Sequence, residues 1–212
     1  MNSEELRNRL REIREGLEKD HAVRLHRAIS WLRCAELHSD TDDDVSVIAL
    51  WVAFNACYAI VDESAEHSER RDFQEFAIKQ CEADKDGKIH DLLWLKYSQF
   101  VRLLIDNQYV FGPFWASMRQ GDANWKEPFE KSKKLAFKAL ANNQTHLLLS
   151  IILDRLYVLR NQLLHGGATY QSQLNREQVR NGKNMLSELM PLFIEIMFEN
   201  DDWGEIYYPV ID

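Results

Sequence analysis

The sequence has few of the residues that interrupt regular structure. Its 212 residues include eight glycines and four prolines, which are too few for the many turns of an all-β sandwich or barrel. The three cysteines, Cys34, Cys57 and Cys81, are an odd number and lack the spacing of zinc ligands, so they indicate neither a disulfide framework nor a zinc site. We therefore expect reduced thiols, as in cytosolic proteins, and no metal or other cofactor.

The sequence also lacks a basic surplus and a membrane-length apolar run. Its formal net charge is −8, which argues against a protein that coats nucleic acid by bulk electrostatics but still allows a local basic groove. The first twenty residues contain no apolar signal-peptide core. The most apolar stretch, 45–61, is short for a membrane span, contains Asn55 and is flanked by acids, so it indicates a buried helix. We expect a cytoplasmic protein that does not span a membrane.

Nearly every segment carries a helical period. Leu6, Leu10, Ile13 and Leu17, for example, recur at intervals of three and four residues and form one face of a helix. The expected helices cover 3–38 with a break near Gly16, 45–62, 66–83, 89–110, 128–142, 145–165 and 174–199. Segment 111–127 is the expected main loop, and the aromatic tail after 202 is expected to dock on the helices.

The chain shows no internal repeat, low-complexity run or flexible linker. The periodicity therefore predicts an all-α fold, an antiparallel helical bundle, organised as one structural unit. We divide it into an N-terminal helical extension, 1–40, which packs on the bundle, and the helical domain itself, 41–212.

The most informative segment is the apolar helix expected over 145–165. On a helical wheel, Ser150, Asp154, Asn161 and His165 fall within about 60° of one another and form a polar stripe. Arg160 is the one charged side chain in the apolar sector. An arginine there must reach solvent, meet an anion or be covered by another subunit. The alternative without a function is an arginine at the edge of the bundle that pairs with a carboxylate.

The segment from Arg160 to His165, Arg-Asn-Gln-Leu-Leu-His, resembles the signature of the HEPN domains. That signature is an arginine, a polar residue that is often asparagine, and a histidine after four to six intervening residues; here glycines 166 and 167 follow. Segment 51–58, WVAFNACY, is similar to a core helix of Apea-like members. The resemblance is sharp over 145–170, extends loosely over 45–199 and does not cover the first forty residues.

The resemblance implies a fold, a partner set and an activity. HEPN domains are α-helical bundles and usually dimers, and many are metal-independent ribonucleases of toxin, phage-defence or RNA-processing systems. It therefore implies RNA as the substrate, a homodimer, and an antitoxin or regulatory protein as a further partner.

The bare spacing is a weak signal, as the chain itself demonstrates. Arg33 and His38 also have four residues between them, and Arg14 and His21 have six. Neither pair has an asparagine after the arginine or a glycine after the histidine. The signal therefore depends on Asn161 and on the glycine stop.

The residue types fit cleavage of RNA by internal attack of a 2′-hydroxyl. That reaction needs a base, an acid for the leaving 5′-oxygen, and positive charge beside the transition state. His165 can serve as acid or base near neutral pH, and the planar fork of Arg160 suits phosphate. Asn161 can orient the imidazole or bind a phosphate oxygen, and we interpret Asp154 as an orienter. Because one histidine cannot be base and acid at once, a second chain is a natural source of the other.

A second group of residues lies before this helix. Segment 119–138 carries six basic and three acidic side chains, with Trp115 and Trp125 alongside. This group could form an RNA-facing patch with stacking platforms, and the alternative is a solvated helix face. Its central basic residues are Lys131, Lys133, Lys134 and Lys138.

The function expected from the sequence is that of a metal-independent endoribonuclease, with a role in toxin–antitoxin or antiviral defence suggested by the resemblance alone. The alternative is a non-catalytic HEPN-like module that mediates dimerisation or regulation, or that binds a nucleotide with Arg160 and His165. Cys34 and His38 stand four apart as half of a metal site, but without a second half a surface pair is the better interpretation.

Overall fold

A computed structural model describes residues 1–60, 68–173, 175–200, 202–206 and 208. Over these residues the protein is all-α, as the sequence predicts, and the nearest approach to a strand is one isolated bridge between Ile60 and Ile206. The helices are α1 (Ser3–Ile13), α2 (Lys19–His38), α3 (Asp43–Tyr58), α4 (Glu69–Ala83), α5 (Lys88–Asp91), α6 (Ser98–Asp106), α7 (Gly112–Gln120), α8 (Lys126–Ala141), α9 (Thr145–Leu164) and α10 (Arg176–Met197). Short turns of other helix types lie at Arg14–Gly16, Leu92–Lys96 and Gln108–Val110.

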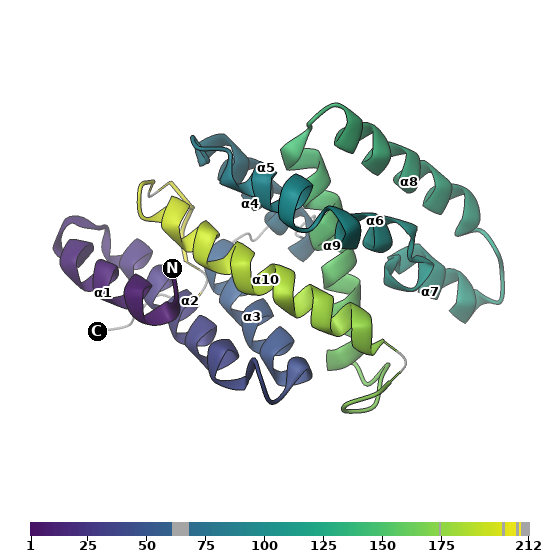
Figure 1. The fold of residues 1–212 in the computed structure, drawn as a ribbon, viewed down its shortest axis with the longest axis horizontal. Coiled ribbons are helices and arrows are strands. Elements are labelled where there is room, and N and C mark those ends of the chain that lie inside the picture. The colour runs from purple at the N-terminus through teal and green to yellow at the C-terminus, as the bar shows by residue number, and fades with distance from the viewer. Residues whose placement is uncertain (61–67, 174, 201, 207, 209–212) are drawn as a thin grey trace.

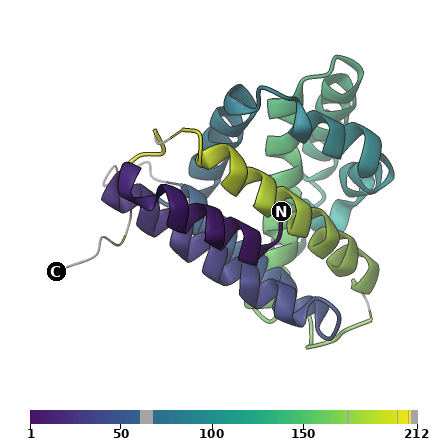
Figure 2. The ribbon, with the colours of Figure 1, turned by 60° about the vertical axis from the view of Figure 1, so that its left-hand side comes forward.

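The helices surround one main core. Helices α2 and α3 form a hairpin, α10 packs on both, and α1 lies along α2 (Figures 1 and 2). Helix α9 packs against α4 on one side and α8 on the other, and α8 lies at the end of the molecule farthest from α1 (Figure 1). Leu6, Leu25, Trp51, Leu153 and Phe193 are all buried in the same apolar cluster, so segment 1–40 shares its core with the rest of the chain.

Local signals explain where several helices begin. Asn2 accepts a hydrogen bond from the backbone N–H of Glu5 while Glu5 binds back to the backbone of Asn2, which makes a capping box at α1. Asp42 caps α3 in a similar way through the backbone N–H groups of Asp44 and Val45. In the part of the chain that the structure covers, no helix has both the length and the apolar character needed to cross a membrane.

The expected continuous helix over 89–110 is wrong, because this segment is broken into α5, a π-helical turn, α6 and a final 3-10 turn. The break allows two side chains of this segment to form hydrogen bonds with other helices. The Trp94 indole N–H donates to the carbonyl of Leu140 at 3.1 Å, and the Tyr97 hydroxyl donates to the carbonyl of Asn184 at 2.8 Å. These contacts tie the segment to α8 and α10 and outweigh its helical period.

The expected loop over 111–127 is also wrong in part, because it contains α7. Pro113 lies in the first turn of this helix, where a proline loses no intrahelical hydrogen bond. The Gly112-Pro113 pair therefore begins a helix inside the expected loop.

The C-terminal segment docks on the helices as expected. Trp203 and Ile206 are buried, and the buried guanidinium of Arg24 donates to the carbonyls of Cys57 and Gly204, each at 2.7 Å. Tyr207 lies outside the described residues. The ring of Tyr208 is exposed, so the docking of this segment depends on Trp203 and on backbone contacts.

Candidate functional site

The candidate motif lies at the C-terminal end of α9, where two glycines reverse the chain. Gly166 has a φ of +69°, a left-handed conformation that favours glycine. A Cβ on Gly167 would lie 3.2 Å from the carbonyl oxygen of Gln162, so this position favours a residue without a side chain. His165 is the last residue before the reversal, and its backbone N–H still bonds to Asn161 at 3.0 Å. Its side chain is exposed.

The Arg160 side chain is largely buried, and 16% of it is exposed. Its Nη1 donates to Oδ1 of Asn161 at 2.8 Å, and its Nη2 lies 3.8 Å from Oε1 of Glu69. The guanidinium also lies over the rings of Trp51 and Tyr157, 5.8 and 5.7 Å from their centres, within the range of a cation–π interaction. Arg160 thus lies beside a carboxylate of its own chain, which is the alternative expected for an arginine without a function.

Glu69, at the start of α4, connects this arginine to α3. The hydroxyl of Tyr58 lies 2.9 Å from Oε1 of Glu69 and 2.7 Å from Oδ1 of Asn55. Burial, and then the negative charge of Glu69, raise the pKa of Tyr58. Asn55, the polar residue within this apolar helix, therefore has a hydrogen-bond partner inside the bundle.

Asp154 lies on the other side of Tyr157 from Arg160. Its Oδ1 is 2.8 Å from Nε of Arg70, and the Arg70 guanidinium lies 5.2 Å from the centre of the Tyr157 ring. Tyr157 is thus flanked by two guanidinium groups from different helices, and each of these is balanced by a carboxylate. The structure assigns Asp154 a partner other than the histidine that we expected it to orient.

The structure brings Arg160 and Asn161 together but leaves His165 apart from them. Among the described residues, no hydrogen bond or ion pair joins the imidazole of His165 to Arg160, Asn161 or Asp154. On a regular helix Arg160 and His165 are about 140° apart around the axis. One chain in this conformation therefore presents the arginine and the histidine on different sides of α9.

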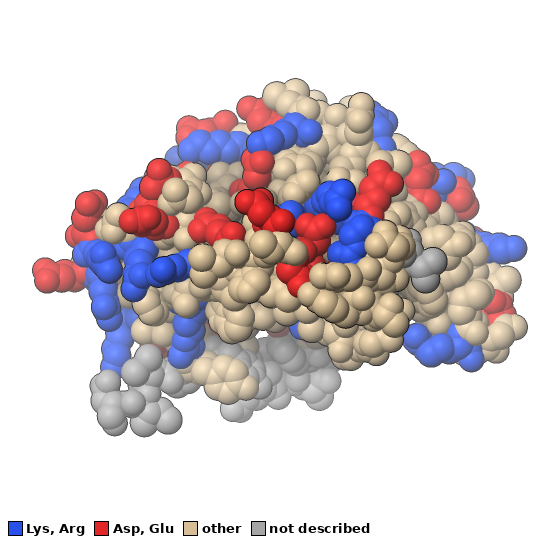
Figure 3. Space-filling view, turned by 60° about the horizontal axis from the view of Figure 1, so that its bottom comes forward, with Lys and Arg blue, Asp and Glu red and all other residues tan. Residues whose placement is uncertain are grey.

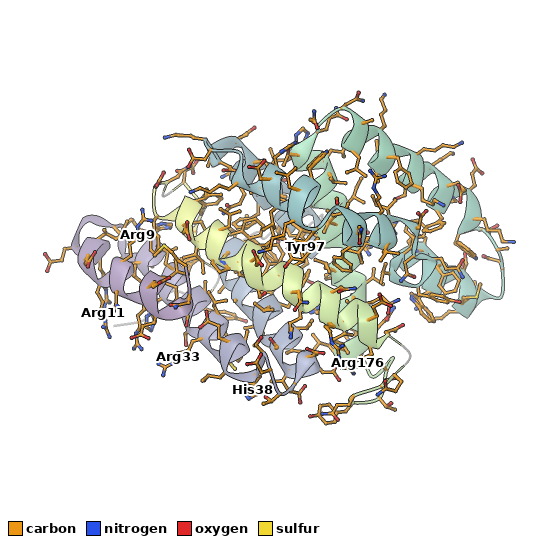
Figure 4. The ribbon with its side chains drawn as sticks, viewed as in Figure 1. Arg9, Arg11, Arg33, His38, Tyr97 and Arg176 are labelled. Carbon is orange, nitrogen blue, oxygen red and sulfur yellow. The ribbon has the colours of Figure 1, made fainter. Side chains whose placement is uncertain are left out.

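The loop after His165 is anchored to the first turn of α3. Asp44 accepts from the backbone N–H of Gln171 at 2.8 Å and from Nη1 and Nη2 of Arg176 at 2.8 and 3.1 Å. This bidentate bond raises the pKa of the Arg176 guanidinium. The hydroxyl of Tyr170 also donates to Asp42. Figure 4 shows Arg176 at the start of α10, beside this loop. These hydrogen bonds to Asp42 and Asp44 hold the loop that follows His165 in place.

The four candidate RNA-binding lysines of α8 differ in their surroundings. Lys131 pairs with Glu127 at 2.7 Å, and Lys133 pairs with Asp106 at 2.8 Å. Lys134 and Lys138 are exposed and form no ion pair with any described residue. Across the face drawn in Figure 3, acidic and basic side chains are interspersed, in keeping with an acidic protein whose basic patches are local.

The two tryptophans beside these lysines belong to a separate aromatic cluster. Trp125 packs with Phe111, Phe114 and Phe129, and the Trp115 indole N–H donates to the carbonyl of Tyr109 at 2.7 Å. Trp125 therefore has a packing role, while Trp115 keeps part of its ring exposed.

Sequence reasoning missed Glu69, Arg70 and Arg155. Arg155 is fully buried, and its guanidinium lies over Phe111 at 4.5 Å and Phe129 at 5.5 Å. Its Nη2 donates to the hydroxyl of Ser132 at 3.0 Å, and burial lowers its pKa to about 10. A charged residue within the most apolar helix was a usable signal for Arg155. Glu69 and Arg70 lie on a polar helix, and only its packing against α9 reveals their role.

Comparisons with known proteins do not assign the site. No family model, curated protein or solved structure matches this chain. The described residues contain no group of three or more His, Cys, Asp or Glu side chains placed to hold a metal ion.

Proposed function

We propose that this chain is a metal-independent endoribonuclease of the HEPN type. The observation that carries the proposal is the end of α9, where an exposed histidine follows five residues after a guanidinium held by a neighbouring amide. Asn161 fixes the plane of the Arg160 fork, which suits two oxygens of one phosphate. His165, at the turn of the chain, is accessible to a large substrate.

The reaction uses these groups in an internal transfer. A base removes the proton of a ribose 2′-hydroxyl, the 2′-oxygen attacks the adjacent phosphorus, and an acid protonates the departing 5′-oxygen. The products are a 2′,3′-cyclic phosphate and a 5′-hydroxyl. His165 acts as the base or the acid, and Arg160 stabilises the negative charge on the phosphoryl oxygens in the transition state.

A homodimer supplies the second histidine. The end of α9 carries an exposed apolar side chain that suits an interface, Leu164, and the 3-10 turn that contacts α9 adds the exposed ring of Tyr109. Gln162 connects the two segments through a 2.6 Å bond from its Nε2 to the carbonyl of Tyr109. We place the dimer contact at this end, so that Arg160 of one protomer approaches His165 of its partner.

The cellular role proposed with this activity is that of a cytoplasmic toxin or antiviral effector restrained by an antitoxin or regulatory protein. Production of the wild-type chain alone is expected to arrest growth, and His165→Ala is expected to relieve the arrest.

One observation favours a second function, that of a non-catalytic dimerisation, regulatory or nucleotide-binding module. The Arg160 guanidinium already has Asn161 and Glu69 as partners. In this alternative Arg160 braces α9 against α4, and RNA is not cleaved.

Incubation of the purified protein with total cellular RNA in excess EDTA separates the two functions. The ribonuclease is expected to cut under these conditions and to leave 2′,3′-cyclic phosphate ends, detectable by mass spectrometry of the fragments. If the RNA remains intact after incubation with folded, dimeric protein, the ribonuclease function is wrong and the non-catalytic module is the better interpretation.

A further inference from the structure

A groove of about 210 Å3 lies between α8 and the segment that runs from the π-helical turn into α6. None of its lining residues belongs to the α9 motif. One wall carries Trp94, Ser98 and Arg102, and the other carries Phe137, Leu140 and Ala141. Pockets that enclose a drug-sized ligand are typically about 300–1,000 Å3, so this groove suits a single ring system that belongs to a longer molecule.

The aromatic wall of the groove is held in place before any ligand binds. The Trp94 indole N–H donates to the carbonyl of Leu140 at 3.1 Å. The imidazole of His90 stacks on Trp94, with ring centres 4.5 Å apart and planes 12° apart. Two contacts thus fix the orientation of the indole. His90 covers one of its faces, and a ligand ring that packs on the remaining surface loses little to reordering of the protein.

Cations without a counter-charge surround the groove. Arg102, Lys134 and Lys138 are exposed, and none of them forms an ion pair with a described residue. Lys134 is three residues before Phe137, and Lys138 is three before Ala141, so each lysine neighbours a lining residue on the α8 surface.

Three of the nearby acids, the two glutamates of α8 and Asp106, pair with lysines other than these. Glu127 pairs with Lys131 at 2.7 Å, and Asp106 and Glu130 lie 2.8 and 3.7 Å from Lys133. An anionic ligand at the groove would therefore meet uncompensated positive charge beside aromatic rings.

We propose that this groove binds single-stranded RNA, with one base against Trp94 and Phe137 and flanking phosphates on Arg102, Lys134 and Lys138. Stacking platforms within a positively charged groove are the usual means of binding single strands, whereas a duplex keeps its bases stacked inside. This inference rests on the proposed function, because the bound strand is taken to be the RNA that the protein cleaves. It adds an RNA-binding site that is separate from the cleavage site.

The test is equilibrium binding of a fluorescent single-stranded 2′-O-methyl RNA oligonucleotide, followed by anisotropy. Methylation of every 2′-oxygen blocks internal attack, so the readout does not depend on cleavage. The double variant Arg102→Glu, Lys134→Glu is expected to weaken binding at least about tenfold and to reduce its salt dependence, since each lost phosphate contact lowers the slope by about 0.7. Phe137→Ala is expected to weaken binding at least about fivefold, the lower end for one stacked base.

Arg33→Glu is the matched control, because Arg33 is exposed on α2, far from α8 (Figure 4). The charge change of the groove double variant is matched by the control double variant Arg11→Glu, Arg33→Glu, since Arg11 is also exposed. If the groove is specific, both controls are expected to bind within about twofold of wild type. Equal losses in the groove and control variants would overturn the proposal in favour of bulk electrostatics. Circular dichroism and thermal melting establish that each variant is folded.

Further outcomes are also decisive. Failure of the wild type to bind, binding of a matched duplex as tightly as of the single strand, or equal competition by polyglutamate would overturn the proposal. Groove-dependent binding without any cleavage of ordinary RNA would uphold this inference while the proposed ribonuclease function failed.

Discussion

The guanidinium of Arg160 lies 3.8 Å from the carboxylate of Glu69 and joins the end of α9 to the start of α4. This relationship explains how a charged side chain is accommodated in the apolar sector of its helix. It also defines what a phosphate must do at the site, because a substrate must share the guanidinium with Glu69. The Arg160 side chain is largely buried, so the attraction of the pair exceeds the ~1 kcal/mol of two such charges in bulk water. A phosphate therefore has to compete with Glu69 through two charge-assisted hydrogen bonds to the guanidinium.

The geometry of the arginine fork gives the first prediction. Arg160→Lys keeps the charge but removes the planar pair of donors. Loss of one charge-assisted hydrogen bond, roughly 1.5 kcal/mol, is expected to lower kcat/KM for RNA cleavage by at least about tenfold. Arg33→Lys is the matched control and is expected to change little. Equal activity of Arg160→Lys and wild type would mean that the fork does not contact the phosphate.

The separation of Arg160 from His165 around α9 predicts a site shared between protomers. We expect a dimeric mass by sedimentation at tens of micromolar, and a monomeric mass there would contradict the dimer. When inactive Arg160→Ala and His165→Ala proteins exchange subunits, about half of the dimers should be mixed. Each mixed dimer keeps one arginine–histidine pair drawn from both chains but only one of the two histidines, so cleavage should return in part. Background cleavage by mixed dimers, with their formation verified by native mass spectrometry, would contradict simple pairing across the interface. Either each chain would then work alone, or the site would need both arginines and both histidines together.

The anchor between Asp44 and the loop after α9 predicts a stability effect. Asp44→Asn removes the charge that faces the Arg176 fork and is expected to lower the free energy of unfolding by roughly 3 kcal/mol, as for other buried pairs that lose one partner. Asp106→Asn, which breaks the more exposed pair with Lys133, is expected to cost less than about 1 kcal/mol. Urea denaturation measures both. Equal, small effects would show that Asp44 does not hold the loop.

Arg155 gives a prediction of the opposite sign. Burial lowers the pKa of its guanidinium to about 10, so the interior disfavours the charge in spite of the two phenylalanine rings. Arg155→Met fills a similar volume without a charge, and thermal melting is expected to show equal or higher stability. Arg155→Ala, which leaves a cavity, is expected to lose roughly 3 kcal/mol. A loss of that size in Arg155→Met would mean that the charge itself is needed.

The sequence was sufficient for the fold class and for most helices, because apolar period and caps such as Asp42 act locally. It failed over 89–127, where distant partners decide the structure: the bonds of Trp94 and Tyr97 to α8 and α10 break one helix. In the candidate site, too, contacts between distant segments were not predicted from the sequence. Asn161 was expected to orient the imidazole or to bind a phosphate oxygen, whereas in the structure it accepts from Arg160. Glu69 comes from another helix, and nothing in its own segment indicates that it faces Arg160.

The central claim is that His165 takes part in RNA cleavage, and one comparison tests it most directly. Cleavage of labelled RNA in EDTA is measured for wild type, His165→Ala and His146→Ala. His146 is an exposed histidine at the opposite end of the same helix, so its variant controls for the loss of an imidazole from α9. Removal of an acid–base catalyst is expected to lower cleavage by His165→Ala at least about a hundredfold, with His146→Ala close to wild type. Equal cleavage by His165→Ala and wild type would contradict the account.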